Sequence, residues 1–104
     1  MMEFKEIKKR IEQEDYLIKS HAISHALKEW FDRRNMVEAV INGKIIEKYL
    51  SEQRVLICGV TKLIGKTKIY LHIVCEYADE IYIEFVTAYI PDNEIWESPP
   101  YKKR

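Results

Sequence analysis

The chain has 104 residues, which is enough for one hydrophobic core but not for two. Its 17 Lys and Arg residues balance its 17 Asp and Glu residues, so no overall field draws it to nucleic acid or to an acidic membrane. No apolar run approaches the roughly 18 residues that span a bilayer, and residues 1–10 are too charged for a signal peptide. We therefore expect a single domain over residues 1–104, located in the cytoplasm, with no membrane partner.

The N-terminal part of the sequence predicts helices. Apolar residues recur at helical spacing among charged ones over residues 3–13, which indicates an amphipathic first helix. Residues 16–18 are expected to form a short extended link, and the hydroxyl of Ser20 can cap a second helix. The apolar stripe of this second helix would consist of Ala22, Ile23, Ala26, Leu27 and Trp30.

No Gly or Pro separates the second helix from the residues that follow, so one long helix over residues 20–42 is an alternative. We favour a break at residues 30–32, because Asp32 is a good N-cap and a new apolar stripe begins behind it. Gly43 then stands where a left-handed residue would end a third helix.

The C-terminal part of the sequence predicts strands. Residues 44–49 and 54–58 would form a first hairpin, and residues 69–77 and 81–90, rich in β-branched and aromatic side chains, a second. Helices followed by an antiparallel meander predict an α+β domain of two layers. In this fold the N-terminal helices pack on one face of an antiparallel sheet of about four strands.

Two further features complete the expected fold. Cys58 and Cys75 stand far apart in apolar strand contexts with no C-x-x-C pair, which predicts buried free thiols. The chain after Pro91 is expected to be irregular and to end in a basic tail over residues 97–104, with only Ile95 and Trp96 able to anchor it.

His72 is the first candidate for chemistry. Strand alternation places it on the face opposite Leu71, together with Tyr70 and, on the next strand, with Tyr82 and Glu84. A three-residue loop over 78–80 would set His72 opposite Val86 and diagonal to Glu84, with Thr87 and Tyr89 on the core side. An imidazole beside a carboxylate and tyrosines could act as general acid and base on a ribose hydroxyl or a phosphate. The same position also fits a histidine that packs under the C-terminal segment and bonds backbone.

His21 is the second candidate, in the first turn of the second helix, where free amides could hold a phosphate. It could equally bond a strand carbonyl and fix the helix to the sheet. His25, four residues on, shares its helix face, but no third metal ligand is evident, so we predict no metal and no cofactor. The candidate catalytic residues are thus His72, Glu84, Tyr82 and His21.

A basic stretch supplies candidates for substrate binding. Between Gln53 and Cys75 there is no acidic residue, and the cations there could contact phosphates together with Tyr70. These cations are Arg54, Lys62, Lys66 and Lys68. The other interpretation of this pattern is solvated turns and strand faces.

An ordered set of residues resembles a known family. The set is His21-Ala22, residues 39–47 with Tyr49, Leu56 and Gly59, residues 71–74, and residues 87–92 with Trp96. Over about residues 18–96 the chain resembles the family catalogued as domain of unknown function four-two-five-eight. Two positions depart from that family, since Glu29 stands where an arginine is frequent and Lys19 where a serine is usual.

That family is similar to the RelE-like and BrnT-like small toxins of bacterial toxin–antitoxin pairs, and its members are often encoded beside antitoxin-like or zinc-ribbon proteins. The resemblance implies a toxin-like protein that cuts RNA without a metal and is neutralised by an antitoxin-like partner. It supplies no catalytic set that can be transferred. The alternative function is a non-catalytic module that binds another protein through the His72 face or through an open sheet edge.

Overall fold

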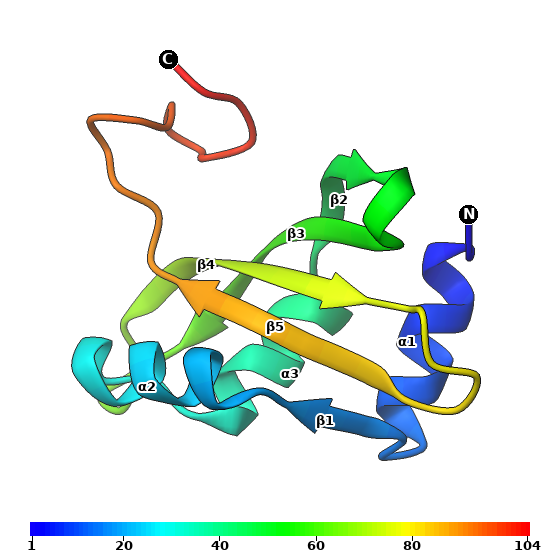
Figure 1. The fold of residues 1–104 in the computed structure, drawn as a ribbon. Coiled ribbons are helices and arrows are strands. Elements are labelled where there is room, and N and C mark those ends of the chain that lie inside the picture. Colours follow the sequence, from blue (N-terminus) through cyan, green and yellow to red (C-terminus); the bar gives the residue numbers. More distant parts are fainter.

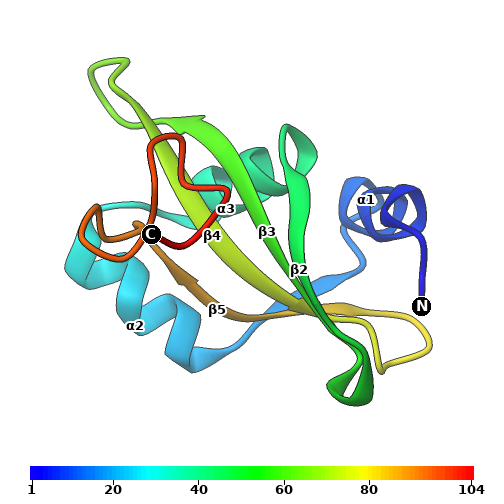
Figure 2. The same cartoon turned by 90° about the horizontal axis from the view of Figure 1, so that it is seen from above.

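The structure is a computed structural model that describes residues 1–104. Three helices, α1 (Phe4–Glu12), α2 (Ser20–Glu29) and α3 (Arg33–Ile41), precede most of the strands. The strands are β1 (Tyr16–Ile18), β2 (Lys44–Tyr49), β3 (Arg54–Lys62), β4 (Lys68–Glu76) and β5 (Ile83–Tyr89), with a 3-10 turn, η1 (Leu50–Glu52), between β2 and β3. The helices lie on one side of the sheet and the C-terminal segment on the other (Figures 1 and 2). The predicted α+β class is confirmed.

The sheet has five strands in the order β1-β5-β4-β3-β2 and is mixed, so the expectation of about four antiparallel strands was wrong in these two respects. The difference is β1, which pairs in parallel with β5 at one edge. The Tyr16 ring stacks on Phe85 at 5.2 Å between centroids, and the Lys19 amide donates to the Phe85 carbonyl at 2.9 Å. A three-residue strand fixed by such distant contacts carries too little local pattern to be recognised in the sequence.

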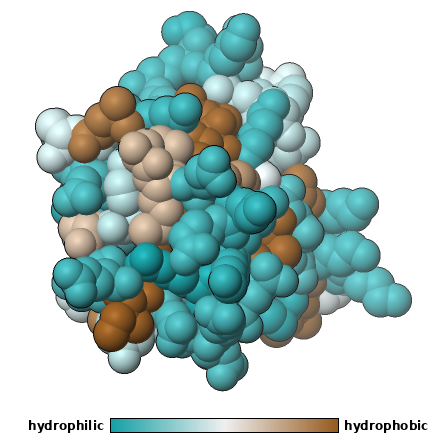
Figure 3. Space-filling model, turned by 90° about the vertical axis from the view of Figure 1, so that its right-hand side faces the viewer, coloured by the Kyte–Doolittle hydropathy of each residue, from teal (hydrophilic) through white to brown (hydrophobic).

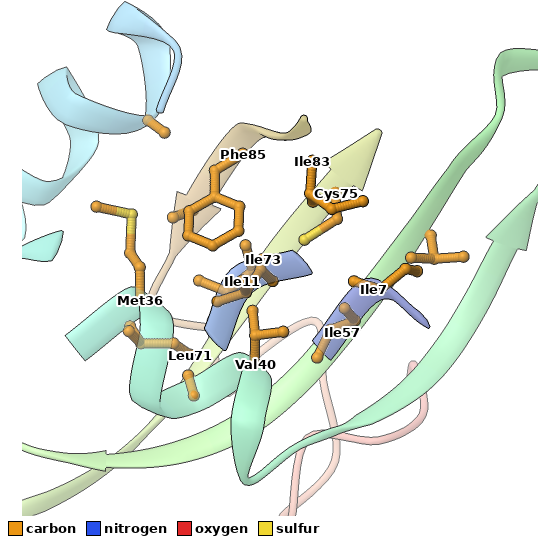
Figure 4. Close-up of a cluster of buried hydrophobic side chains, with 14 of the residues drawn as sticks. Ile7, Ile11, Met36, Val40, Ile57, Leu71, Ile73, Cys75, Ile83 and Phe85 are labelled. Atoms are coloured by element: carbon orange, nitrogen blue, oxygen red, sulfur yellow. The ribbon is translucent and has the colours of Figure 1, made fainter. Parts of the chain in front are cut away.

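The core fills the space between the sheet and the helices. It comprises 17 buried residues, and Figure 4 shows Phe85, Ile73 and Ile57 of the sheet facing side chains of α1 and α3. Ile7 and Ile11 give α1 its buried stripe, as the helical spacing predicts. Each fully buried side chain of this size contributes about 1.5–3 kcal/mol. None of the helices combines the length and the apolar character needed to cross a membrane.

Two glycines let α3 approach the sheet closely. A Cβ built on Gly59 would lie 1.7 Å from the carbonyl oxygen of Ala39, and one on Gly43 would lie 2.5 Å from the same oxygen. The expectation that Gly43 takes a left-handed conformation was wrong, because Gly65 is the only glycine with a positive φ. The helix ends on Asn42, and Gly43 serves close packing.

The break between α2 and α3 is where the sequence predicts it. Trp30 takes a left-handed conformation (φ 65°), and Asp32 and Asn35 form a reciprocal capping box at the start of α3. The predicted cap of α2 was wrong, since Lys19 precedes the helix and makes no side-chain cap bond. The predicted stripe of α2 holds only in part: Ala22 and Ala26 are buried, whereas Ile23, Leu27 and Trp30 are exposed.

A β-bulge sets the register of β4 against β5. His72 pairs with Tyr89, and the expected pairing with Val86 was wrong. Val74 pairs with Thr87 but Cys75 pairs with Phe85, so Val86 is an extra residue on β5. The extra residue reverses the alternation, so Ala88 faces the core, whereas Thr87 and Tyr89, expected on the core side, turn to the His72 face.

The connection before this bulge is also longer than expected. It runs over residues 77–82 in place of the predicted three residues. The Asp79 carboxylate orders it by accepting from the amides of Ile81 and Tyr82, each at 2.8 Å. Those bonds hold the pKa of Asp79 below its usual value.

Candidate functional site

Part of the sheet face opposite the helices is covered by residues 92–104, which we name the C-terminal cover (Figures 1 and 2). The cover folds back on itself through a bridge between Trp96 and Lys103. The Arg104 amide donates to the Ile95 carbonyl at 2.8 Å and the Glu97 amide to the Lys102 carbonyl at 2.9 Å. Of the two expected anchors, Trp96 is buried, as predicted, whereas Ile95 is exposed, so the prediction for Ile95 was wrong.

His72 lies beneath this cover and is fully buried. Its Nε2 is 2.8 Å from the carbonyl oxygen of Pro100, and its Nδ1 is 3.1 Å from the hydroxyl of Tyr89. A carbonyl only accepts, so Nε2 carries the proton and the Tyr89 hydroxyl donates to Nδ1. The Trp96 indole meets the imidazole edge-on, with ring centroids 4.4 Å apart.

The electrostatics keep this imidazole neutral. Burial lowers the pKa of His72, and the Pro100 carbonyl and the charge of Glu47 oppose that shift only in part. Burial and the Glu47 charge raise the pKa of Tyr89 to about 12. The Tyr49 hydroxyl donates to the Glu47 carboxylate. Burial, and to a smaller extent this hydrogen bond, raises the pKa of Tyr49 as well.

We name Glu47, Tyr49, His72 and Tyr89 the sheet-face cluster. It spans β2, β4 and β5, and Lys103 of the cover approaches Glu47 at 4.0 Å. Cys58 of β3 pairs directly with His72, and burial raises the pKa of its thiol to about 11. Both cysteines are free and buried, as the sequence predicts. No buried side-chain polar atom in the protein lacks a hydrogen-bond partner.

The other candidate catalytic residues lie away from His72. Glu84 pairs with Glu76, and Glu76 is four residues from His72 along β4, a separation of about 13 Å at the rise of a strand. Glu84 forms an ion pair with Lys19 at 3.4 Å. Tyr82 is exposed in the β4–β5 connection. His21 is exposed on α2, across the sheet, with its ring edge-on to His25.

Tyr89 therefore stands beside His72 where other residues were expected, and Glu47, to which Tyr49 donates, acts on His72 through its charge. The bulge at Val86 concealed Tyr89, since regular alternation assigns it to the core. A second register shift, between Ile45 and Glu47, changes which side chains of β2 lie on this sheet face, so regular alternation does not predict them. The sequence held one signal for these residues: Glu47, Tyr49 and Tyr89 all belong to the set of residues by which the chain resembles the family of unknown function.

Most candidate substrate-binding residues gather at one end of the same face. Lys62 pairs with Lys68 and Val60 with Tyr70, so the alternation that exposes His72 to the cover also turns these side chains that way. Tyr101 of the cover meets Tyr70 edge-on at 6.0 Å between centroids. The surface formed here, which we name the basic-aromatic surface, comprises Lys44, Lys62, Lys68, Tyr70 and Tyr101.

Lys44 and Tyr101 were not singled out in the sequence. The Lys44 ammonium lies 3.8 Å from the centroid of the Tyr101 ring. Lys66 lies in the turn between β3 and β4 with a positive φ of 68°. Arg54 does not join them, because it stands at the far end of β3, bonded to Glu76 at 2.9 Å.

No group of three His, Cys, Asp or Glu side chains is arranged to hold a metal ion. A hollow of about 530 Å³ lies between α1 and α3 and is lined in part by Ile11, Tyr16 and Arg33, away from the sheet-face cluster. Comparisons with protein-family models, with curated proteins and with solved structures found no match. The resemblance drawn from the sequence stays a prediction.

Proposed function

We propose that this protein binds RNA and cuts it in the manner of a small toxin, with His72 as the acid–base group. The observation that carries the proposal is the basic-aromatic surface, which lies on the same sheet face as the sheet-face cluster. Lysines neutralise phosphates, and aromatic rings such as the half-buried ring of Tyr70 can stack on bases. Tyr70 is two residues from His72 on one face of β4, about 7 Å away, which is close to the spacing of neighbouring nucleotides.

The charge arrangement at this surface also favours an anion. Lys62 and Lys68 stand directly opposite each other, and like charges at such a cross-strand pair repel. A phosphate between them would remove that repulsion. The net charge of zero implies that RNA contact would be confined to this surface, with no long-range attraction by the whole protein.

Cleavage requires the C-terminal cover to move, because both ring nitrogens of His72 are bonded and the ring has no exposed surface. Once the ring is hydrated, its pKa returns toward neutrality. Movement of the cover frees Nε2, because Pro100 belongs to the cover, whereas Tyr89 on β5 stays at Nδ1. With the ring proton moved to Nδ1 and donated to the Tyr89 oxygen, Nε2 could then take the proton of a ribose 2′-hydroxyl as that oxygen attacks the adjacent phosphorus. The bond to the 5′-oxygen breaks, and the Tyr89 hydroxyl can supply the proton that this leaving group needs.

The RNA-binding part is tested with a fluorescent single-stranded RNA oligonucleotide. The double variant Lys62→Ala/Lys68→Ala should weaken binding and reduce the slope of log affinity against log salt by about 1.4. The matched control is Lys5→Ala/Lys9→Ala, which removes two exposed lysines from α1. Equal loss in both double variants would overturn the assigned surface.

The cleavage part is tested by expressing the protein alone in bacteria and sequencing RNA ends. Growth arrest with new RNA ends is expected, and His72→Gln, which keeps a hydrogen-bond donor, should relieve it. Trp96→Ala, which loosens the cover, should increase cleavage by the purified protein. Harmless expression, with no RNA cut by either the wild type or Trp96→Ala, would overturn the nuclease assignment.

A second function, binding of a partner protein without catalysis, is supported by a separate observation. Leu27, Trp30 and Ile64 have 77%, 88% and 100% of their surface exposed. Large exposed apolar side chains that gather in one place mark interaction sites. Affinity capture of the tagged protein should recover a partner, such as the antitoxin-like protein, and lose it with Trp30→Ser. Identical recovery with that variant would overturn the role of these residues.

A further inference from the structure

The corner where α2 meets α3 lies beside the tip of the β3–β4 hairpin and carries an apolar surface. We name Ile23, Leu27, Trp30 and Ile64 the corner patch. One hollow of about 290 Å³ is lined by Ile23, Leu27 and Met36, among others, and another of about 270 Å³ by Leu27, Trp30 and Ile64. Leu27 borders both hollows, so the patch is continuous.

The fold itself makes little use of these side chains. Trp30 takes a left-handed conformation, which is uncommon for a bulky residue, and its indole makes neither a ring-stacking nor a cation–π contact. Ile64 stands fully exposed in the hairpin turn. The side of the molecule that carries α1 differs, since it is mostly hydrophilic with small separate hydrophobic areas (Figure 3).

The charges around the corner patch are unbalanced. Arg33 borders the first hollow and Arg34 borders the second. Lys28 follows Leu27 in the sequence, and Lys66 lies in the same hairpin turn as Ile64. Arg34 is itself paired with Glu38 at 3.7 Å, whereas Arg33 donates only to the neutral Tyr16 hydroxyl at 3.0 Å, and neither Lys28 nor Lys66 forms a salt bridge. The excess positive charge therefore lies on Lys28, Arg33 and Lys66. The nearby carboxylates make bonds within the fold. Asp32 accepts from the Asn35 amide at 3.1 Å, Glu29 accepts from the Ile90 amide at 3.2 Å, and Glu38 accepts from Thr61 at 2.9 Å.

We infer that the corner patch docks an amphipathic helix of a partner protein, one that carries large apolar side chains flanked by Asp and Glu. This inference rests on the protein-binding function proposed above and names the partner's chemistry. The apolar side chains enter the two hollows, and the carboxylates meet the cations at their borders. A second copy of this chain does not fit, because it would bring the same cations together. Strand addition does not fit either, because β1, the nearest edge, has three residues.

The inference is tested by display of a library of helical peptides with a fixed apolar stripe and random charged flanks. Selection on the wild-type protein should enrich peptides with acidic flanks at least tenfold over basic ones. Selection on Trp30→Ser should lose that enrichment, while the control Leu50→Ser, an exposed apolar residue on η1, should retain it. Thermal unfolding of each variant checks that the fold is kept.

The outcomes separate the two claims. Enrichment of basic or uncharged helices that is lost with Trp30→Ser would overturn the acidic chemistry and leave the protein-binding function standing. Enrichment that is equal on wild type and Trp30→Ser would overturn the patch as the docking site. No enrichment on the wild type, together with affinity capture that recovers no partner, would overturn both.

Discussion

The hydroxyl of Tyr89 lies 3.1 Å from Nδ1 of His72, on a strand where regular alternation would bury it in the core. The extra residue Val86 turns Tyr89 to the His72 face. With the Pro100 carbonyl on Nε2, the imidazole links β4, β5 and the C-terminal cover at one point. The free energy of these two hydrogen bonds helps to hold the C-terminal cover on the sheet face.

His72→Ala should destabilise the folded state by about 2–4 kcal/mol. The change removes two hydrogen bonds, leaves a cavity beneath Trp96 and leaves the Pro100 carbonyl without its donor. Urea unfolding followed by circular dichroism measures the loss. His21→Ala serves as control, because His21 is exposed and its removal should change stability by less than about 0.5 kcal/mol. Equal effects of the two variants would contradict this description of His72.

Stability should fall as the pH drops below the ordinary histidine pKa of 6.5. Burial lowers the pKa of His72 in the folded protein, so below pH 6.5 the unfolded chain binds a proton that the folded chain does not. The stability is therefore complete above that pH and is lost progressively down to the folded-state pKa. Denaturant unfolding between pH 7.5 and pH 5 measures this slope. His72→Gln should flatten the curve over that range, and an unchanged slope would exclude His72 as its source.

Trp96→Ala should loosen the C-terminal cover and expose the Cys58 thiol. In the closed protein Cys58 is buried and burial raises its pKa to about 11, so it should react slowly with a disulfide reagent at pH 8. Removing the indole should raise that rate at least tenfold. Cys75→Ser provides a background in which only Cys58 reports, and Ile95→Ala is the control because Ile95 is half exposed. Rates that are the same in both variants would show that Trp96 does not hold the cover.

Gly59→Ala should be far more damaging than Gly65→Ala. The new methyl group at Gly59 would lie 1.7 Å from the Ala39 carbonyl oxygen, so α3 must move away from the sheet. We expect a loss of about 3 kcal/mol or more, visible as a lower melting temperature or insoluble protein. Gly65 has open space and a φ of 89°, so its substitution should cost about 1 kcal/mol. Similar melting temperatures for the two variants would contradict the close approach of α3.

The parts of the fold that rest on local chemistry were predictable. The break before Asp32 follows from a capping pattern in adjacent residues, and the buried stripe of α1 follows from helical spacing. The pairing of β1 and the bulge at Val86 depend on contacts between distant strands, and no local pattern announces them.

The candidate site divides in the same way. Strand alternation correctly separated His72 from the Leu71 face and placed Tyr70 with it. Lys62 and Lys68 were expected outside the strands, and they reach that face because β3 and β4 are longer than predicted. It failed for Glu84 because the connection before β5 is longer than predicted, which sets Glu84 opposite Glu76. It failed for Tyr89 because the inserted residue Val86 turns that side chain to the His72 face. Of the two alternatives for His72, the structure has the one in which it packs under the C-terminal segment and bonds backbone. The sequence left this choice open, because it depends on where the irregular residues 92–104 come to rest.

The parallel pairing of β1 with β5 has a consequence for how the protein is made. The first strand of the chain finds its only partner in the last strand, so most of the sequence must be synthesised before that edge of the sheet can close. Until then α1 and α2 have no complete sheet to cover. Hydrogen exchange on chains stalled before Ile83 should accordingly find Tyr16–Ile18 unprotected, with protection appearing once β5 has emerged.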